Sequence, residues 1–283
     1  MNEVEFYKLT QEQLQRLAES RGLSKNQLNE YFELVDYKSP SLKGVKGINL
    51  VFAQILRHAC NATMLSNIID WENKIDFIKK ITYDFDAKKF VENNKLSQYK
   101  EFKPDDKNVL SLVEIFREGF QWDSSKSKPE NKDKLAKRYA GSMIEAAIYV
   151  SKFKKKEDVL IDLSNNYKDH SVEDIVEYFR KNIKTGFSVA LTCDFLKEFD
   201  KSFNDIGKPD VHIKDTLKTL YKDKKYKNEY EYVNDMREIV EKAKIIDKDL
   251  TVYKLDRMIW LICSNNFFLH VGNSKQEYLD KIK

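Results

Sequence analysis

Residues 182–221, NIKTGFSVALTCDFLKEFDKSFNDIGKPDVHIKDTLKTLY, join two helical patterns through an unusual polar segment. Apolar residues recur at helical rather than strand spacing over residues 189–199, and a second helix is expected from about Val211. A short basic turn that contains Gly186 precedes the first helix, and a polar loop leads through Pro209 to Asp210 before the second. The stretch therefore predicts two consecutive helices, each entered through a chemically distinctive residue.

The residues at the start of both helices are suited to electrostatic roles. Gly186 allows the backbone to approach a ligand closely, and exposed amides at a helix start attract an anion such as phosphate. Lys184 adds positive charge at the same place. Asp210 follows a proline, which predicts a helix boundary there and puts the carboxylate at a helix N-terminus, a position that favours negative charge.

The arrangement resembles the helix-hairpin-helix DNA glycosylases. In that family a glycine-containing hairpin grips a backbone phosphate, and a helix-opening aspartate follows about twenty residues later. Here GFSVA at residues 186–190 resembles the end of the hairpin, and PDVHI at residues 209–213 resembles the aspartate segment. The family hairpin usually has two glycines, whereas this turn has only Gly186.

The resemblance implies an all-α, two-lobed helical bundle in which Asp210 is the catalytic residue. Members that also nick the strand use a hairpin lysine as nucleophile, and Ser188 stands at the best matching position. The resemblance therefore implies a monofunctional enzyme, although Lys184 and Lys208 are close enough in sequence to leave a displaced lysine open. The expected contacts with the DNA backbone come from Lys184, Thr185, Gly186, Ser188, Lys208 and His212.

The same residues have a purely structural interpretation. An aspartate before a helix is most often an N-cap, and a single glycine often only makes a turn. The order and spacing of turn, apolar helix, loop and aspartate favour the glycosylase. A catalytic Asp210 is expected to face a cleft, whereas a capping aspartate would bond only the amides of its own helix.

Composition limits the partners and the compartment. The 283 residues carry 50 Lys+Arg against 46 Asp+Glu, a net charge of +4, so a DNA-binding surface must come from local clustering. The three cysteines, Cys60, Cys193 and Cys263, are too few for a four-cysteine iron-sulfur cluster and far apart, and we expect neither a metal site nor a cofactor. No signal peptide or membrane span is predicted, which indicates a soluble cytoplasmic protein. We also expect the protein to be a monomer.

With only 8 Gly and 4 Pro, nearly the whole chain is expected to be helical. Thr10 with Gln13 and Ser24 with Gln27 are capping-box patterns that predict two short N-terminal helices. We expect residues 1–45 to form an N-terminal helical extension and residues 46–283 to form the core with two packed lobes.

A pocket for an extruded base is expected from several polar and aromatic residues. His58 and Asn61 lie in the apolar helical segment of residues 48–71. The resemblance implies that Asn61 enters the duplex where the base has left, with His58 beside the pocket, although both residues also fit ordinary helix positions. Trp122 offers a ring for stacking, and Arg138 and Tyr139 are expected to line the cleft by analogy with the family helix before the hairpin. Core packing is the alternative for the aromatic residues.

The sequence thus predicts a glycosylase that flips a modified base from double-stranded DNA and hydrolyses its bond to the sugar, leaving an abasic site. Base excision repair and defence against phage with modified DNA are both compatible with it. A non-catalytic helical protein that binds nucleic acid or another protein is the alternative.

Overall fold

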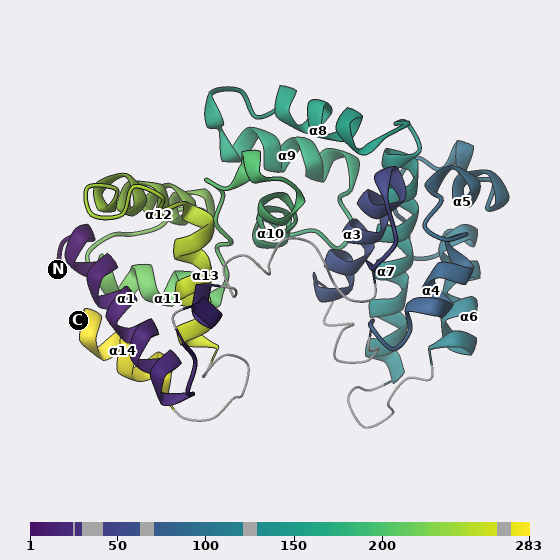
Figure 1. Ribbon diagram of the computed structural model, residues 1–283. Coiled ribbons are helices and arrows are strands. Elements are labelled where there is room, and N and C mark those ends of the chain that lie inside the picture. The colour runs from purple at the N-terminus through teal and green to yellow at the C-terminus, as the bar shows by residue number, and fades with distance from the viewer. Residues whose placement is uncertain (25, 30–41, 63–70, 121–128, 265–272) are drawn as a thin grey trace. The chain divides into compact units, whose positions relative to one another are not determined.

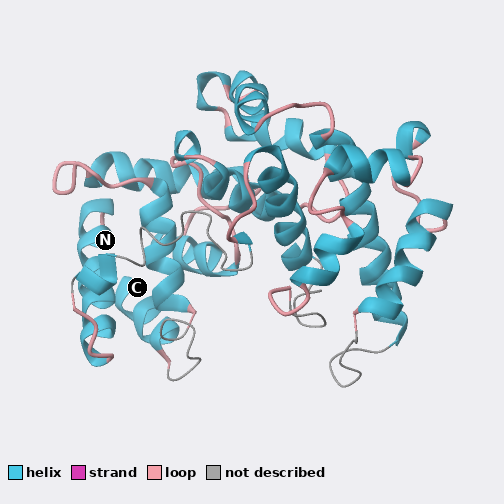
Figure 2. Ribbon diagram, turned by 45° about the vertical axis from the view of Figure 1, so that its right-hand side comes forward, coloured by secondary structure: helices cyan, strands magenta, loops and turns pink. Residues whose placement is uncertain are grey.

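The computed structural model describes residues 1–24, 26–29, 42–62, 71–120, 129–264 and 273–283. These residues form helices, turns and loops and no strand (Figures 1 and 2), which confirms the predicted all-α class. The chain divides into two compact units, one formed by Met1–Tyr37 with Leu196–Lys283 and the other by Lys38–Phe195. We call them the terminal unit and the central unit.

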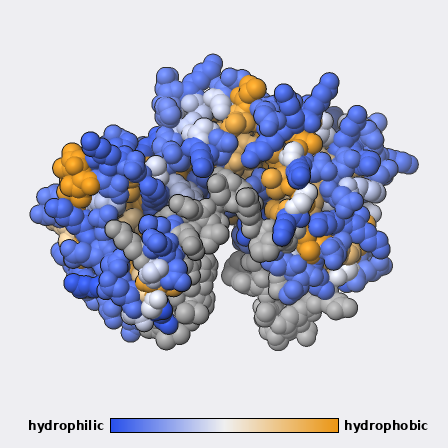
Figure 3. Space-filling model, in the orientation of Figure 1, coloured by the Kyte–Doolittle hydropathy of each residue, from blue (hydrophilic) through white to orange (hydrophobic). Residues whose placement is uncertain are grey.

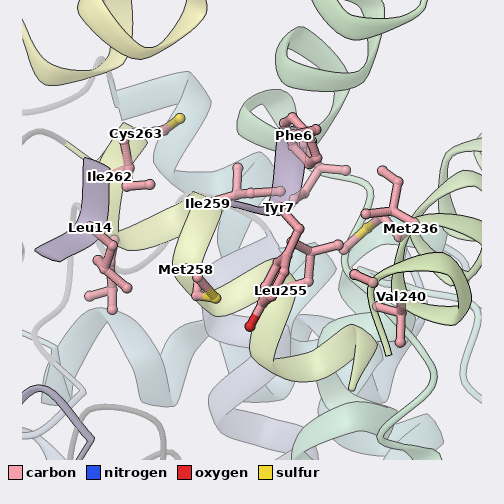
Figure 4. Close-up of a cluster of buried hydrophobic side chains, with 14 of the residues drawn as sticks. Phe6, Tyr7, Leu14, Met236, Val240, Leu255, Met258, Ile259, Ile262 and Cys263 are labelled. Atoms are coloured by element: carbon pink, nitrogen blue, oxygen red, sulfur yellow. The ribbon is translucent and has the colours of Figure 1, made fainter. Parts of the chain in front are cut away.

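The terminal unit combines α1 with the last helices of the chain. Its helices are α1 (Glu3–Ser20), α11 (Val211–Leu220), α12 (Tyr230–Ala243), α13 (Val252–Cys263) and α14 (Ser274–Ile282). α1 packs against α12, α13 and α14. Figure 4 shows the buried side chains at which they meet, among them Phe6, Tyr7, Leu14, Met236, Leu255 and Ile259.

The predicted boundary between residues 45 and 46 does not coincide with this division. Phe6 and Tyr7 are 0% and 1% exposed, so α1 is part of a hydrophobic core rather than an extension beside one. The Tyr7 hydroxyl also donates a hydrogen bond of 2.5 Å to Asp247. Because the partner residues are more than 200 positions away, the local sequence pattern carried no sign of this packing.

The predicted cap at Thr10 is also wrong. α1 begins earlier, at Glu3, and Asn2 caps it by accepting from the Glu5 amide at 2.9 Å while Glu5 accepts from the Asn2 amide. Thr10 lies inside the helix, buried, with its hydroxyl donating to the Phe6 carbonyl. The second pattern is confirmed, because Ser24 and Gln27 exchange the hydrogen bonds of a capping box.

The central unit is built around one long helix, α7 (Pro129–Val150), which packs against α3, α5, α6 and α9. Buried residues such as Tyr139, Ile144 and Tyr149 fall at positions spread around α7, as expected for a helix enclosed by others. The other elements are α3 (Gly47–Ala62), α4 (Ile75–Ile81), α5 (Ala87–Asn93), η3 (Leu96–Gln98), α6 (Lys107–Gly119), α8 (Lys156–Asn165), η4 (Lys168–His170), α9 (Val172–Asn182) and the first part of α10 (Val189–Phe199). A short η5 (Lys201–Phe203) follows α10 in the terminal unit.

Most of the face drawn in Figure 3 is hydrophilic, in keeping with a chain in which 34% of residues are charged. Among the helices that the structure describes, none combines the length and the apolar character needed to cross a membrane.

Candidate functional site

The turn between α9 and α10 has the backbone geometry that its glycine predicts. Gly186 has a φ of +81°, in the left-handed region that favours glycine. Ser188 then caps α10, since its Oγ accepts from the Leu191 amide at 3.2 Å. The predicted succession of helix, turn and helix is confirmed. The Ser188 hydroxyl oxygen is used in this capping hydrogen bond, and the contact of Ser188 with DNA stays a prediction.

α7 holds this turn through two polar side chains. The carboxylate of Glu145 accepts from the Thr185 amide at 2.7 Å and from the Thr185 hydroxyl at 2.9 Å. The Ser142 hydroxyl donates to the Thr185 carbonyl at 2.6 Å. Thr185 is therefore the anchor of the turn, only 8% exposed, and Lys184 beside it is exposed.

Gly141 lets the turn lie this close to α7. A Cβ atom at this position would be 2.9 Å from Cγ2 of Thr185 and 2.3 Å from Cδ2 of Phe102. The small residues Gly141 and Ser142 of α7 thus lie directly against the turn.

Glu145 was missed by the sequence analysis. Burial raises the pKa of its carboxyl above the ordinary value, while the hydrogen bonds from Thr185 and the charge of Lys184 oppose that rise. The signal in the sequence is a single carboxylate within the apolar run MIEAA at residues 143–147. The Glu145 carboxylate is half-buried and needs hydrogen-bond donors, and the turn supplies them.

Asp210 is the N-cap of α11. Its Oδ1 accepts from the His212 amide at 2.9 Å and from the Ile213 amide at 3.2 Å. The side chain is half-buried, and Oδ2 has no hydrogen-bond partner among the described residues. One oxygen is therefore held by the helix start. These are the bonds expected of a capping aspartate, and they also fix the orientation of the carboxylate.

The loop before Asp210 is held by a buried ion pair. Asp256 of α13 is 1% exposed, and its Oδ2 accepts from Lys197 Nζ at 2.7 Å and from the Lys208 amide at 2.7 Å. Burial raises the pKa of Asp256, Lys197 opposes the rise, and the negative charge of Asp210 adds to it. The sequence pattern did not predict this contact between α13 and the loop.

His212 is the second residue of α11 and is half-buried. Its Nδ1 is buried and has no hydrogen-bond partner in the part of the chain that the structure describes. Burial lowers the pKa of the imidazole below its ordinary value, and the neighbouring Asp210 opposes this. His212, Lys208 and Asp210 are thus brought together in the terminal unit.

Of the residues predicted for the base pocket, His58 is buried and polar. Its Nδ1 lies 3.7 Å from Oδ2 of Asp194 in α10, and its ring meets Phe195 edge-on with centroids 5.7 Å apart. Asn61 is exposed near the end of α3, as the structural alternative expected. The sequence did not predict the pairing of His58 with Asp194.

Tyr139 and Arg138 occupy different environments. Tyr139 is 0% exposed and packs on Phe116 with ring centroids 5.6 Å apart, which is the core alternative for this residue. Arg138 is exposed beside it on α7. Trp122, the third of these candidates, lies outside the described residues.

Within the described ranges, no group of three or more histidine, cysteine, aspartate or glutamate side chains is placed to hold a metal ion. Comparison of the chain with protein-family models, with curated proteins and with solved structures found no match.

Proposed function

We propose that the protein is a DNA glycosylase of the helix-hairpin-helix type that hydrolyses the bond between a modified base and its sugar in double-stranded DNA. It acts as a cytoplasmic monomer and leaves an abasic site. The observation that supports this most is the state of Asp210, whose Oδ1 is held by two helix amides while its Oδ2 accepts no hydrogen bond from a described residue.

The chemistry follows from that arrangement. As the bond from C1′ to the base nitrogen breaks, positive charge develops on the sugar, and a fixed carboxylate stabilises it. The same carboxylate orients the water whose oxygen adds to C1′, and the departing base takes up a proton. Because Oδ1 is already occupied, Oδ2 is the oxygen assigned to both tasks.

The turn at residues 184–186 supplies the grip on the DNA backbone in this proposal. Its left-handed glycine and its exposed lysine support that role. Ser188 at the position of the family's nucleophilic lysine supports hydrolysis without strand cleavage.

The proposal is tested by base release from damaged, mismatched and phage-type hypermodified duplexes, with alkali added to reveal abasic sites. Wild-type protein is expected to give alkali-dependent cleavage of one class of duplex. Asp210→Asn keeps the size of the side chain and is expected to abolish base release while retaining the fold and most of the DNA affinity. Undiminished base excision by Asp210→Asn would show that Asp210 has no catalytic role.

A second candidate is a helical protein that binds nucleic acid without acting on it. Two observations favour it, since Asp210 makes the bonds of an ordinary cap and the amide of Thr185 already donates to Glu145. DNA binding without base release from any member of the panel would support this alternative.

A further inference from the structure

Asp256 is a buried carboxylate in the core of the terminal unit. It belongs to α13, which packs against α1, α11, α12 and α14, and it is only 1% exposed. A carboxylate in such surroundings is costly unless a cation or hydrogen-bond donors balance it. The reaction proposed for Asp210 does not use this carboxylate directly.

Two donors converge on one oxygen of Asp256. Lys197 Nζ, near the end of α10, lies 2.7 Å from Oδ2, and the Lys197 side chain is itself only 8% exposed. The Lys208 amide donates to the same oxygen at 2.7 Å. The Lys197 cation offsets the cost of burying the carboxylate, because it opposes the rise in the pKa of Asp256 that burial causes. The Lys208 amide connects α13 to the loop that leads to Asp210.

The hydrogen bonds continue from Lys208 to Asp210. The Lys208 carbonyl accepts from the Asp210 amide at 2.7 Å, across Pro209, which has no amide hydrogen of its own. Asp210 Oδ1 in turn accepts from the amides of the first turn of α11. A continuous path of hydrogen bonds therefore runs from the carboxylate of Asp256, through Lys208, to the backbone and side chain of Asp210.

Other contacts hold the middle of this loop. Arg237 of α12 donates through Nε to the Asp205 carbonyl at 2.9 Å, and the Tyr253 amide donates to the Asn204 carbonyl at 2.9 Å. These bonds fix the loop at residues 204 and 205, and the bond to Asp256 fixes its end. The segment just before Asp210 is therefore the part whose position depends on Asp256.

The charge of Asp256 also acts on Asp210 through space. The negative charge of Asp210 raises the pKa of Asp256, which shows that the two carboxylates repel each other, while Lys197 opposes this rise. Asp256 can therefore influence Asp210 in two ways, by this repulsion and by the hydrogen bond to the Lys208 amide. An experiment has to separate the two effects.

We propose that Asp256 positions Asp210 for hydrolysis of the bond between base and sugar, by holding the Lys208 amide, and that Lys197 is the cation that balances its charge in the core. The inference deepens the proposed function and rests on it. Asp256 acts through Lys208 and is a positioning residue. Because a displacement of about 1 Å in a reacting group can slow a reaction by roughly 100-fold, the hydrogen bond is expected to affect the rate more than the affinity for DNA.

Two double variants isolate the hydrogen bond. Asp256→Asn with Lys197→Met keeps an acceptor for the Lys208 amide, whereas Asp256→Leu with Lys197→Met removes it. Neither leaves a buried charge without its partner, and protein cores tolerate the replacement of such an ion pair as a unit. Both variants also abolish the repulsion between residue 256 and Asp210, so that effect is the same in the two proteins being compared.

The rate of base release is measured in a single turnover, with protein in excess over the duplex on which the wild type acts, together with the affinity for that duplex. The asparagine variant is expected to release base within about threefold of the wild-type rate, and the leucine variant roughly 10- to 100-fold more slowly at the same affinity. Equal rates for the two variants would overturn the positioning role. A loss confined to affinity would also overturn it, because Asp256 would then act in binding.

Amide hydrogen exchange tests the same hydrogen bonds without relying on catalysis. The Lys208 and Asp210 amides are expected to exchange roughly tenfold faster in the leucine variant than in the asparagine variant. The Tyr253 amide, which donates to Asn204, is the internal control and is expected to exchange equally in both. Equal exchange of the Lys208 amide in the two variants would contradict the role. If even the wild type releases no base, the proposed function is refuted, and the exchange rates alone decide whether Asp256 holds the loop before Asp210.

Asp256→Glu provides a second test if the leucine variant does not fold. Glutamate keeps the negative charge beside Lys197 but moves the carboxylate by one methylene group, so base release is expected to be roughly tenfold slower at unchanged DNA affinity. A wild-type rate of base release by Asp256→Glu would contradict the positioning role.

Discussion

At the scale of single residues, polar side chains in the described structure accept hydrogen bonds from backbone amides at a helix start and at a turn. Asp210 binds two amides at the start of α11, and Glu145 binds the amide and hydroxyl of Thr185. The sequence identified Asp210 because the signal for a helix start lies within a few residues of it. It did not identify Glu145, whose partner is 40 positions away.

His212 gives a residue-scale prediction of pH dependence. Its folded-state pKa lies below the ordinary value, so as pH falls below about 6.5 the unfolded chain binds a proton there that the folded protein does not. This contribution to stability is therefore present above the unfolded pKa and lost as pH falls through the folded pKa. Urea denaturation between pH 7.5 and 5 is expected to show a smaller loss for His212→Gln than for wild type, and parallel curves would contradict the assignment.

At the scale of elements, helix ends were predictable wherever the capping interaction is local. Ser171 caps α9 by accepting from the Asp174 amide, three residues along the chain, at 3.2 Å. The Thr10 pattern failed because the same residue types also fit a helix interior, where Thr10 bonds the Phe6 carbonyl. Asn2 with Glu5 is the better local signal and opens the helix.

The turn gives an element-scale prediction. Gly186→Ala places a side chain at a φ of +81° and is expected to lower the free energy of unfolding of the central unit by roughly 1–2 kcal/mol, since L residues are strained there. Gly186→Asn is the control, because asparagine tolerates left-handed backbone better than alanine. Denaturant titration of the variants checks this. Equal stability of the alanine variant and wild type would show that the turn relaxes without cost.

At the scale of the whole molecule, the two units contain contacts between distant residues that the sequence pattern does not predict. The terminal unit unites the first helix with the last four helices described. The Tyr7 hydroxyl and Asp247, which meet there, are 240 positions apart. The amphipathic pattern shows that α1 has an apolar face, but it does not say which helices cover that face.

This packing leads to a prediction about stability. Phe6 is 0% exposed and lies against Tyr278, so Phe6→Ala is expected to destabilise the terminal unit by roughly 3–5 kcal/mol through the cavity it leaves. Ile245→Ala in the same unit is the control, because Ile245 is 75% exposed and its loss is expected to change stability by less than about 0.5 kcal/mol. The stability of both variants is measured by denaturant titration and by amide hydrogen exchange in α1 and α13. Similar losses for the two variants would contradict the core role of α1.

The sequence by itself determined the all-α class, the turn at Gly186 and the helix that opens at Asp210. These follow from apolar spacing, from few glycines and prolines and from bonds between residues two to four positions apart, and such interactions are local. Only the tertiary structure decided that α7 holds the turn through Glu145 and that Asp256 holds the Lys208 loop 48 positions away. The physical reason is that a buried carboxylate requires donors, and packing alone determines which distant backbone supplies them.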